Sequence, residues 1–414
     1  MQQAVKPASL WHNRDYLLLW SGQLVSNAGS GISQIAFPLL ILAMTHSPLQ
    51  AGFVSALGTL TYVLCTLPAG ALLDRWDRKR VMIISDIGRT LSLASIPLAL
   101  FLGQLTIVQI YIVTFVSGTL GIFFDIAQLA CLPQVVAKEQ LPKAMGRTQA
   151  SLGIMNLVSP PIGATLFSLS RLLPFLTDAI SYAASVFSLF LIRTPFQQPR
   201  TTARSNLAVE ITEGLRWLWR QPLLRTMALL TCVNVFSGGG YLLIVIVMAQ
   251  QRHASDATIG LIFATGGLGA VLGSLASSHV QQRFSFAQII VGVLWLYVVL
   301  WLPLVALPSP LLLGLITALL SFIGPFYNVT NIGRRLAITP DALQSRVNSV
   351  ARLIGLGLWP LGQALTGILL QYSGARMTIL FSIGIQVLLA LAATLTPHIR
   401  NAPPLNTFKD GHKE

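Results

Sequence analysis

Charged residues are scarce in this chain. Asp, Glu, Lys and Arg make up only 10% of the 414 residues, whereas 54% are hydrophobic. A soluble domain usually carries about a quarter charged residues. The shortage therefore argues against an ordinary soluble protein and indicates a membrane protein.

Cysteine and histidine are also few, and their positions argue against the simplest reactive sites. Cys65, Cys131 and Cys232 lie far apart and have neither metal-ligand nor disulfide spacing, so we interpret them as small buried apolar residues. The six histidines fall in predicted loops, ends or tails. The sequence therefore predicts no metal site, no cofactor and no enzymatic centre.

Long apolar runs occupy most of the remaining sequence. Each is about 20 residues or longer, which is enough to cross a bilayer as a helix. The twelve predicted spans are 16–44, 50–73, 81–102, 107–132, 148–170, 174–193, 223–249, 258–278, 286–307, 310–333, 347–370 and 376–397. The prediction is an all-α integral membrane protein with twelve transmembrane helices.

The net charge of +14 is explained by where the Lys and Arg residues lie relative to the predicted spans. When the 27 Lys and Arg residues are sorted by predicted span, all but Arg171, Arg252 and Arg376 fall on one side. Because the side rich in Lys and Arg is cytoplasmic, both termini are predicted to be cytoplasmic and nucleic acid is not expected as a partner. No cleavable signal precedes the first span, so this span is expected to direct insertion.

The longest polar segment divides the chain into two halves of six spans. The predicted halves are 1–193 and 223–414, joined by a linker at 194–222. The linker is interpreted as ending in an interfacial helix on the cytoplasmic surface. Its predicted apolar face consists of Ile211, Leu215, Leu218 and Trp219.

The two halves carry matching residues in the same order. The stretch "FFDIAQL" at 123–129 corresponds to "FYNVTNI" at 326–332. Three further residues match with identical spacing, namely Arg147, Pro161 and Gly163 against Arg346, Pro360 and Gly362. These matches predict a duplicated architecture of two pseudo-symmetric six-helix bundles.

The stretch "GALLDRWDRKRV" at 70–81 places six charged residues between two apolar runs. It resembles the signature loop of the major facilitator superfamily, with Asp77 where that family usually has a second glycine. The matching residues are Gly70, Leu72, Asp74, Arg75, Arg78 and Lys79. "FFDIAQLACLPQVV" and "EGLRWLWRQPLLR" look like its branch of macrolide-efflux and siderophore-exporting proteins. The resemblance covers nearly the whole chain and implies the major facilitator fold, a transporter, and the bacterial cytoplasmic membrane.

The signature loop is expected to act as a gate. Asp74 ends the second span with a charge that can face a helix N-terminus. The family's geometry implies that this is the start of the eleventh span, near Arg346. The contact would latch the two halves while the cavity faces outward. Gly70 is expected to allow a close approach of two helices.

Asp125 is the acid deepest inside a predicted span, and two interpretations stay open. An ionisable group in a membrane is a functional candidate, so Asp125 could carry the coupling proton. The resemblance instead implies that it pairs with Arg78 of the signature loop as part of the same latch.

The remaining ionisable groups of the spans have simpler interpretations. Asp86 and Arg89 are one helical turn apart and predict a local ion pair. Asp178 is interpreted as an outward cap at the start of the sixth span. Arg352 belongs either to the cytoplasmic gate or to a site for an anionic cargo.

Polar residues on the apolar spans predict the substrate cavity. Gln23, Asn27, Ser30 and Gln34 recur at helical spacing as one stripe. Spans one and seven line the central cavity in the family, which this stripe suits. A helix–helix hydrogen bond is the alternative role for each residue. The other cavity candidates are Tyr62, Asn156, Asn234, Tyr241, Trp359 and Gln363.

The stretch "SPPIGA" at 159–164 bears on direction. With Pro160, Pro161 and Gly163, it resembles the antiporter signature of the fifth span and favours export. A helix kink without directional meaning is the alternative. The predicted function is proton-coupled efflux of amphipathic small molecules by a monomer in the lipid bilayer. The alternative is an importer that works as a proton or ion symporter.

Overall fold

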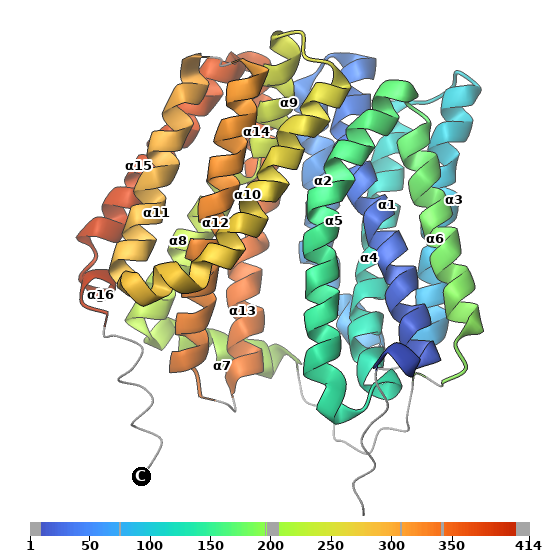
Figure 1. Ribbon diagram of the computed structural model, residues 1–414, viewed down its shortest axis with the longest axis horizontal. Coiled ribbons are helices and arrows are strands. Elements are labelled where there is room, and N and C mark those ends of the chain that lie inside the picture. The colour runs from blue at the N-terminus through green and yellow to red at the C-terminus, as the bar shows by residue number, and fades with distance from the viewer. Residues whose placement is uncertain are drawn as a thin grey trace, which may run out of the picture. The chain divides into compact units, whose positions relative to one another are not determined.

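The computed structural model describes residues 10–73, 76–194, 196, 207–306, 309–340 and 343–402. Within these residues all regular structure is helical (Figure 1). Twelve segments are long and apolar enough to cross a membrane. The predicted all-α membrane protein with twelve spans is therefore confirmed.

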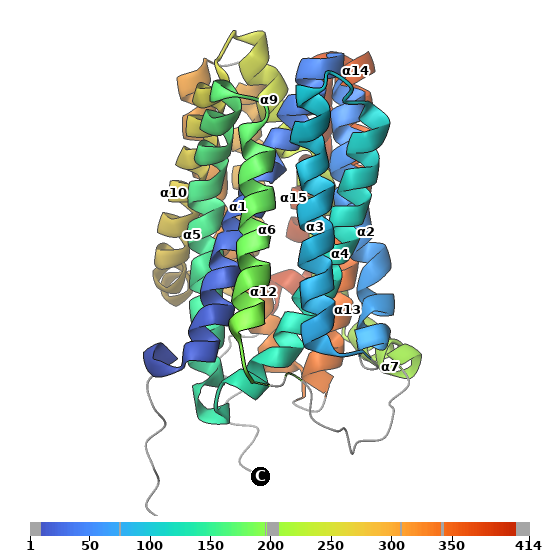
Figure 2. The same ribbon diagram turned by 90° about the vertical axis from the view of Figure 1, so that its right-hand side faces the viewer.

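The first compact unit comprises Met1–Thr45 and Leu57–Thr201. Within it α1 packs against α5 and α6, while α3 packs against α4 and α6 (Figure 2). Its helices, after the short turn η1 (Leu10–His12), are α1 (Arg14–Thr45), α2 (Pro48–Leu73), α3 (Arg78–Phe101), α4 (Ile107–Val135), η2 (Lys138–Gln140), α5 (Leu141–Leu169) and α6 (Leu173–Leu191).

The second compact unit comprises His46–Ala56, which includes the first turns of α2, and Thr202–Glu414. Its largest helix contact joins α10 to α12. Its helices are α7 (Leu207–Arg220), α8 (Pro222–Gly238), α9 (Tyr241–Gln251), α10 (Asp256–Arg283), α11 (Phe286–Trp301), η3 (Leu302–Ala306), α12 (Pro310–Ile338), α13 (Gln344–Gly357), α14 (Trp359–Tyr372), α15 (Gly374–Leu395) and α16 (Pro397–Arg400).

Two spans that the sequence analysis treated as continuous are interrupted. The span at 223–249 is divided between α8 and α9, and that at 347–370 between α13 and α14. Three successive glycines at 238–240 weaken the first helix, and Pro360 favours a new helix start in the second. The two interrupted segments are in contact: a Cβ added at Gly239 would lie 3.0 Å from the carbonyl oxygen of Trp359.

The internal repeat has a counterpart within each unit. A Cβ added at Gly163 of α5 would lie 2.7 Å from the carbonyl oxygen of Ile32 in α1. A Cβ added at the matching Gly362 of α14 would lie 2.1 Å from that of Phe236 in α8. The matched glycines thus mark the same contact, of the fifth span on the first and of the eleventh on the seventh.

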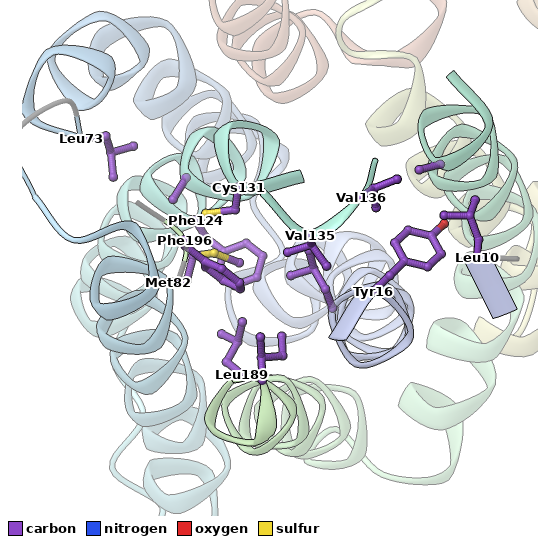
Figure 3. Close-up of a cluster of buried hydrophobic side chains, with 14 residues drawn as sticks. Leu10, Tyr16, Leu73, Met82, Phe124, Cys131, Val135, Val136, Leu189 and Phe196 are labelled. Carbon is purple, nitrogen blue, oxygen red and sulfur yellow. The ribbon is translucent and has the colours of Figure 1, made fainter. Parts of the chain in front are cut away.

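A cluster of buried hydrophobic side chains lies in the first unit (Figure 3). Phe124 and Cys131 of α4 meet Met82 of α3, Leu189 of α6 and Phe196 there. Cys131 is fully buried, as the sequence predicts, while Cys65 and Cys232 are partly buried. The cluster joins the ends of α3, α4 and α6 beside the residues of the signature loop.

The linker helix α7 packs against α13 and α8. Its buried residues are Gly214, whose added Cβ would lie 2.9 Å from the backbone of Arg346, and Leu218, which is 0% exposed. Leu215 and Trp219 are 39% and 46% exposed. Leu218 therefore packs inward, whereas Leu215 and Trp219 stay open on the surface. A position at the membrane interface stays a prediction.

Candidate functional site: signature loop and buried charge cluster

The described part of the signature loop comprises 70–73 and 76–81, so Asp74 and Arg75 lie outside the described residues. Asp77, which stands where the family usually has glycine, is the N-cap of α3, and its side chain accepts from the backbone N–H of Arg80 at 3.0 Å. Its φ of −65° is accessible to any residue. An aspartate can therefore serve here, where it satisfies a free N–H at the helix start.

Two cations of the loop bind the ends of neighbouring helices. Arg78 donates from Nη1 to the carbonyl oxygen of Ala130 in α4 at 2.8 Å. Lys79 donates from Nζ to the carbonyl oxygen of Ile192, the C-cap of α6, at 2.6 Å. The carbonyl of Ile192 lacks an intrahelical partner at the end of α6 and carries partial negative charge, so it suits a cation. Both contacts fix the loop to its own unit. The pairing of Arg78 with Asp125 stays a prediction.

The expected close approach at Gly70 stays a prediction. Among the described residues, no atom lies within 4 Å of a Cβ added at Gly70. On the same helix, close packing occurs at Gly52, where an added Cβ would lie 2.7 Å from the Cα of Gly367 in α14. Among the described residues, the close contact of α2 is therefore near its N-terminal end.

Arg346, the predicted neighbour of Asp74, lies in α13 and forms an ion pair with Glu213 of α7. Sequence analysis did not single out Glu213. The amphipathic character of the linker helix was the available signal, because a helix that docks on a neighbour brings its charged residues beside that neighbour as well.

The polar stripe of α1 divides between two neighbouring helices. Gln23 and Gln128 of α4 exchange hydrogen bonds between their amides. The Ser30 hydroxyl bonds to the hydroxyl of Tyr182 in α6 at 2.8 Å. Asn27 is half-buried and Gln34 is exposed. Helix–helix bonding, the alternative interpretation, thus applies to Gln23 and Ser30.

The cavity candidates of the second unit show the same mixture. Asn234 accepts from Gln386 of α15 at 3.1 Å, and Tyr241 bonds to Thr317 of α12 at 2.8 Å. Trp359 lies at the break between α13 and α14 and, like Gln363, is half-buried. In the first unit Tyr62 is half-buried and Asn156 is exposed. That these residues line a cavity stays a prediction.

The "SPPIGA" segment lies inside α5, which continues through Pro160 and Pro161. It packs tightly on α1, since a Cβ added at Gly31 would lie 2.6 Å from the Cβ of Ser159 and Gly163 approaches Ile32 as described above. This segment is therefore closely packed on α1. Its meaning for transport direction stays a prediction.

The ion pair of Asp86 and Arg89 is confirmed, at 3.3 Å between Oδ1 and Nη1. It is also far more enclosed than an exposed helix pair, because the side chain of Asp86 is 0% and that of Arg89 12% exposed. The guanidinium stacks on Tyr182 of α6, with Cζ 3.8 Å from the ring centroid. It also donates to the Tyr182 and Ser30 hydroxyls.

The interpretation of Asp178 as an outward cap is wrong. The N-cap of α6 is Leu172, and Asp178 lies further along the helix with only 1% exposure. Its Oδ1 accepts from Ser181 at 3.3 Å and faces α1, where a Cβ added at Gly29 would lie 2.6 Å away. Asp178 also interacts electrostatically with Arg89. A small residue on α1 makes the room for this buried carboxylate.

The structure therefore brings together a buried charge cluster, which we define as Asp86, Arg89, Asp178 and Tyr182. Arg89 and Tyr182 lie at the midpoints of α3 and α6. Sequence analysis missed the cluster because it placed its acids at the ends of spans. The signal was available, since intramembrane ionisable residues are rare and mark functional sites.

The sequence profile described as "Transmembrane secretion effector", which represents a major facilitator family, matches residues 7–409. The chain belongs to the major facilitator superfamily. Members of this superfamily are membrane transporters and not enzymes.

Two exporters are similar to this major facilitator protein over nearly their full lengths. The multidrug efflux pump Tap of Mycolicibacterium fortuitum is 29% identical over 408 residues, which cover 93% of this chain and 96% of Tap. The enterobactin exporter EntS of Escherichia coli K12 is 25% identical over 406 residues, which cover 94% of each chain.

Solved structures share the fold. A bacterial homologue of ferroportin in an inward-facing state has a TM-score of 0.74 at 16% identity, covering 92% of this chain and 98% of that one. An inward-facing bacterial homologue of Spinster has a TM-score of 0.73 at 13% identity, covering 93% and 97%. This chain is a multi-pass bacterial membrane transporter of the efflux type, and it moves a small-molecule substrate through a lipid bilayer.

Proposed function

We propose that this transporter exports amphipathic small molecules from the cytoplasm in exchange for protons, by alternating access of its two halves. It does so as a monomer with both termini in the cytoplasm. The observation that carries the proposal is the full-length likeness to two exporters, one named for multidrug efflux and one for enterobactin.

The second unit offers a surface that suits an amphipathic solute. An apolar groove of about 620 Å³ lies between α8 and α15, beside the break at Leu358. Pockets for small molecules usually have volumes of about 300–1,000 Å³. Its lining is almost entirely aliphatic or aromatic, with hydroxyls only at Thr226 and Thr396. Such a lining favours a solute with a large apolar part over a sugar or a small carboxylate.

Transport direction can be tested with ethidium as the probe. Everted membrane vesicles that contain the transporter should accumulate ethidium when respiration acidifies their lumen, and a protonophore should release it. Vesicles without the transporter are the control. Accumulation in right-side-out vesicles instead would contradict export and would support the symporter alternative.

Asp74→Asn is expected to shift the transporter toward the inward-facing state. Asp74 ends a span with a charge suited to a helix N-terminus, an interaction that contributes about 0.3–1 kcal/mol and more when partly buried. A cysteine placed at Asn156, which is exposed on α5, would then be labelled faster from the cytoplasmic side. Unchanged labelling from both sides would contradict the proposed latch.

A further inference from the structure

The buried charge cluster contains more acid than base. Asp86 and Asp178 are 0% and 1% exposed, and Arg89 is the cation between them. Burying a charge without a partner is energetically unfavourable. One guanidinium balances one carboxylate, so a second ionised carboxylate would leave an uncompensated negative charge inside the span. A bound proton removes that charge.

Among the described neighbours of Asp86 and Asp178, Arg89 is the one cation in contact. The groups that α1 turns toward the cluster are the hydroxyls of Ser30 and Ser33, and α6 contributes the neutral phenol of Tyr182. From α4, Asp125 interacts electrostatically with Asp86 and Arg89. Asp125 is exposed, unlike the two buried acids. Among the described groups that α1, α4 and α6 bring beside Asp86 and Asp178, acids therefore outnumber the one cation, Arg89.

One oxygen of the cluster has unused bonding capacity. Asp86 Oδ1 contacts Arg89, but Oδ2 has no hydrogen-bond partner within the described ranges, although the hydroxyl of Ser185 lies beside this carboxylate. A buried acceptor without a donor is costly as an anion. Protonation of this oxygen lowers that cost.

The two carboxylates lie on opposite sides of the arginine. Consecutive spans alternate in direction, so α3 and α6 run antiparallel (Figure 2). Asp86 precedes Arg89 by three residues and Asp178 precedes Tyr182 by four. With a rise of 1.5 Å per residue, the carboxylates are separated by about 10 Å along the helix axes. The acids therefore bracket the middle of the unit.

We propose that Asp86 and Asp178, on either side of Arg89, share one exchangeable proton, and that this is the proton the transporter trades for its cargo. The role in exchange depends on the proposed function, whereas the proton site does not. An O–H bond forms on one carboxylate when the proton enters. Arg89 then pairs with the carboxylate that stays ionised, and the bond breaks when the proton leaves on the other side. Asp125, which is exposed and interacts electrostatically with Asp86, gives the proton its route to water.

The proton site can be tested without any cargo. Infrared difference spectra of the purified transporter between high and low pH, in H₂O and D₂O, should show a carboxyl C=O band from a buried acid. Asp86→Asn and Asp178→Asn should each lose it, because one acid is then balanced by Arg89. Arg89→Gln should strengthen it. Glu139→Gln, which changes an exposed acid of the same unit, should keep it.

The proposal can be contradicted even if one of the variants does not fold. A wild-type transporter that shows no such band at any pH at which it stays folded would overturn it. A band that is unchanged in both aspartate variants would also overturn it.

A transport assay then tests the role of the proton. In energised everted vesicles, Asp178→Asn should lose uphill accumulation of ethidium while exchange of ethidium down its own gradient continues. Full uphill accumulation by this variant would overturn the coupling role. If the wild type itself accumulates no ethidium, the proposed function fails, but the infrared result still decides whether the proton site exists.

Discussion

Gly269→Ala should destabilise the transporter, although alanine is the better helix former. A Cβ at position 269 would lie 2.0 Å from the carbonyl oxygen of Ala318, and one at Gly273 would lie 2.0 Å from that of Phe322. These atoms are backbone, so α10 and α12 would have to move apart along their whole contact. Overpacking of this kind costs about 1–3 kcal/mol, and two backbone clashes in Gly269→Ala/Gly273→Ala should cost more. Thermal unfolding in detergent, followed by size-exclusion chromatography, measures the loss.

Gly292→Ala is the matched control, in the same unit and also inside a helix. No described atom lies within 4 Å of a Cβ at this position of α11. Because alanine is favoured over glycine by roughly 1 kcal/mol in a helix interior, this change should leave the melting temperature equal or raise it. Similar melting temperatures for Gly269→Ala and Gly292→Ala would contradict the close packing of α10 on α12.

Gly52→Ala should open the contact that the first turns of α2 make with Gln363 and Gly367 of α14. The new Cβ would lie 2.7 Å from the Cα of Gly367 and 2.9 Å from the carbonyl oxygen of Gln363. A clash of about 1–3 kcal/mol corresponds to a roughly 5- to 150-fold shift between two states. Ser47, which donates to Gln371 at 2.8 Å, reports on this contact.

The measurement is the rate at which an impermeant maleimide labels Ser47→Cys, with the three native cysteines replaced by alanine. Gly52→Ala should speed labelling, whereas Gly58→Ala should not, because a Cβ at position 58 would make only an ordinary contact of 3.4 Å with Thr114. Equal rates in the two variants would show that the contact does not limit access.

The sequence predicts the architecture well because span length and charge bias follow directly from the bilayer. Twelve apolar runs become twelve spans, and matched glycines such as Gly163 and Gly362 make matching contacts. The sequence analysis missed the interruptions at 238–240 and at Leu358. It identified spans by their apolar content, and a broken helix can be as apolar as a continuous one. Only the glycine run and Pro360 carried that information.

The candidate site was predicted less completely, since it depends on which helices face each other. Asp86 and Arg89 were predicted to pair because they lie on one helix. Their neighbours Asp178 and Tyr182 lie on another, and no spacing rule connects α3 to α6. The loop cations show the same limit, because Lys79 is recognisable as a cation near the membrane, while its bond to Ile192 depends on where α6 ends.

The exchange of protons for cargo is tested most directly by recording the lumenal pH of proteoliposomes as ethidium moves. With purified transporter and no preset pH gradient, an inward ethidium gradient should make the lumen more alkaline in the wild type. The reason is that each ethidium entering the lumen is exchanged for protons that leave it. Asp178→Asn should carry ethidium without the pH change. Ethidium movement by the wild type with no movement of protons would contradict the account.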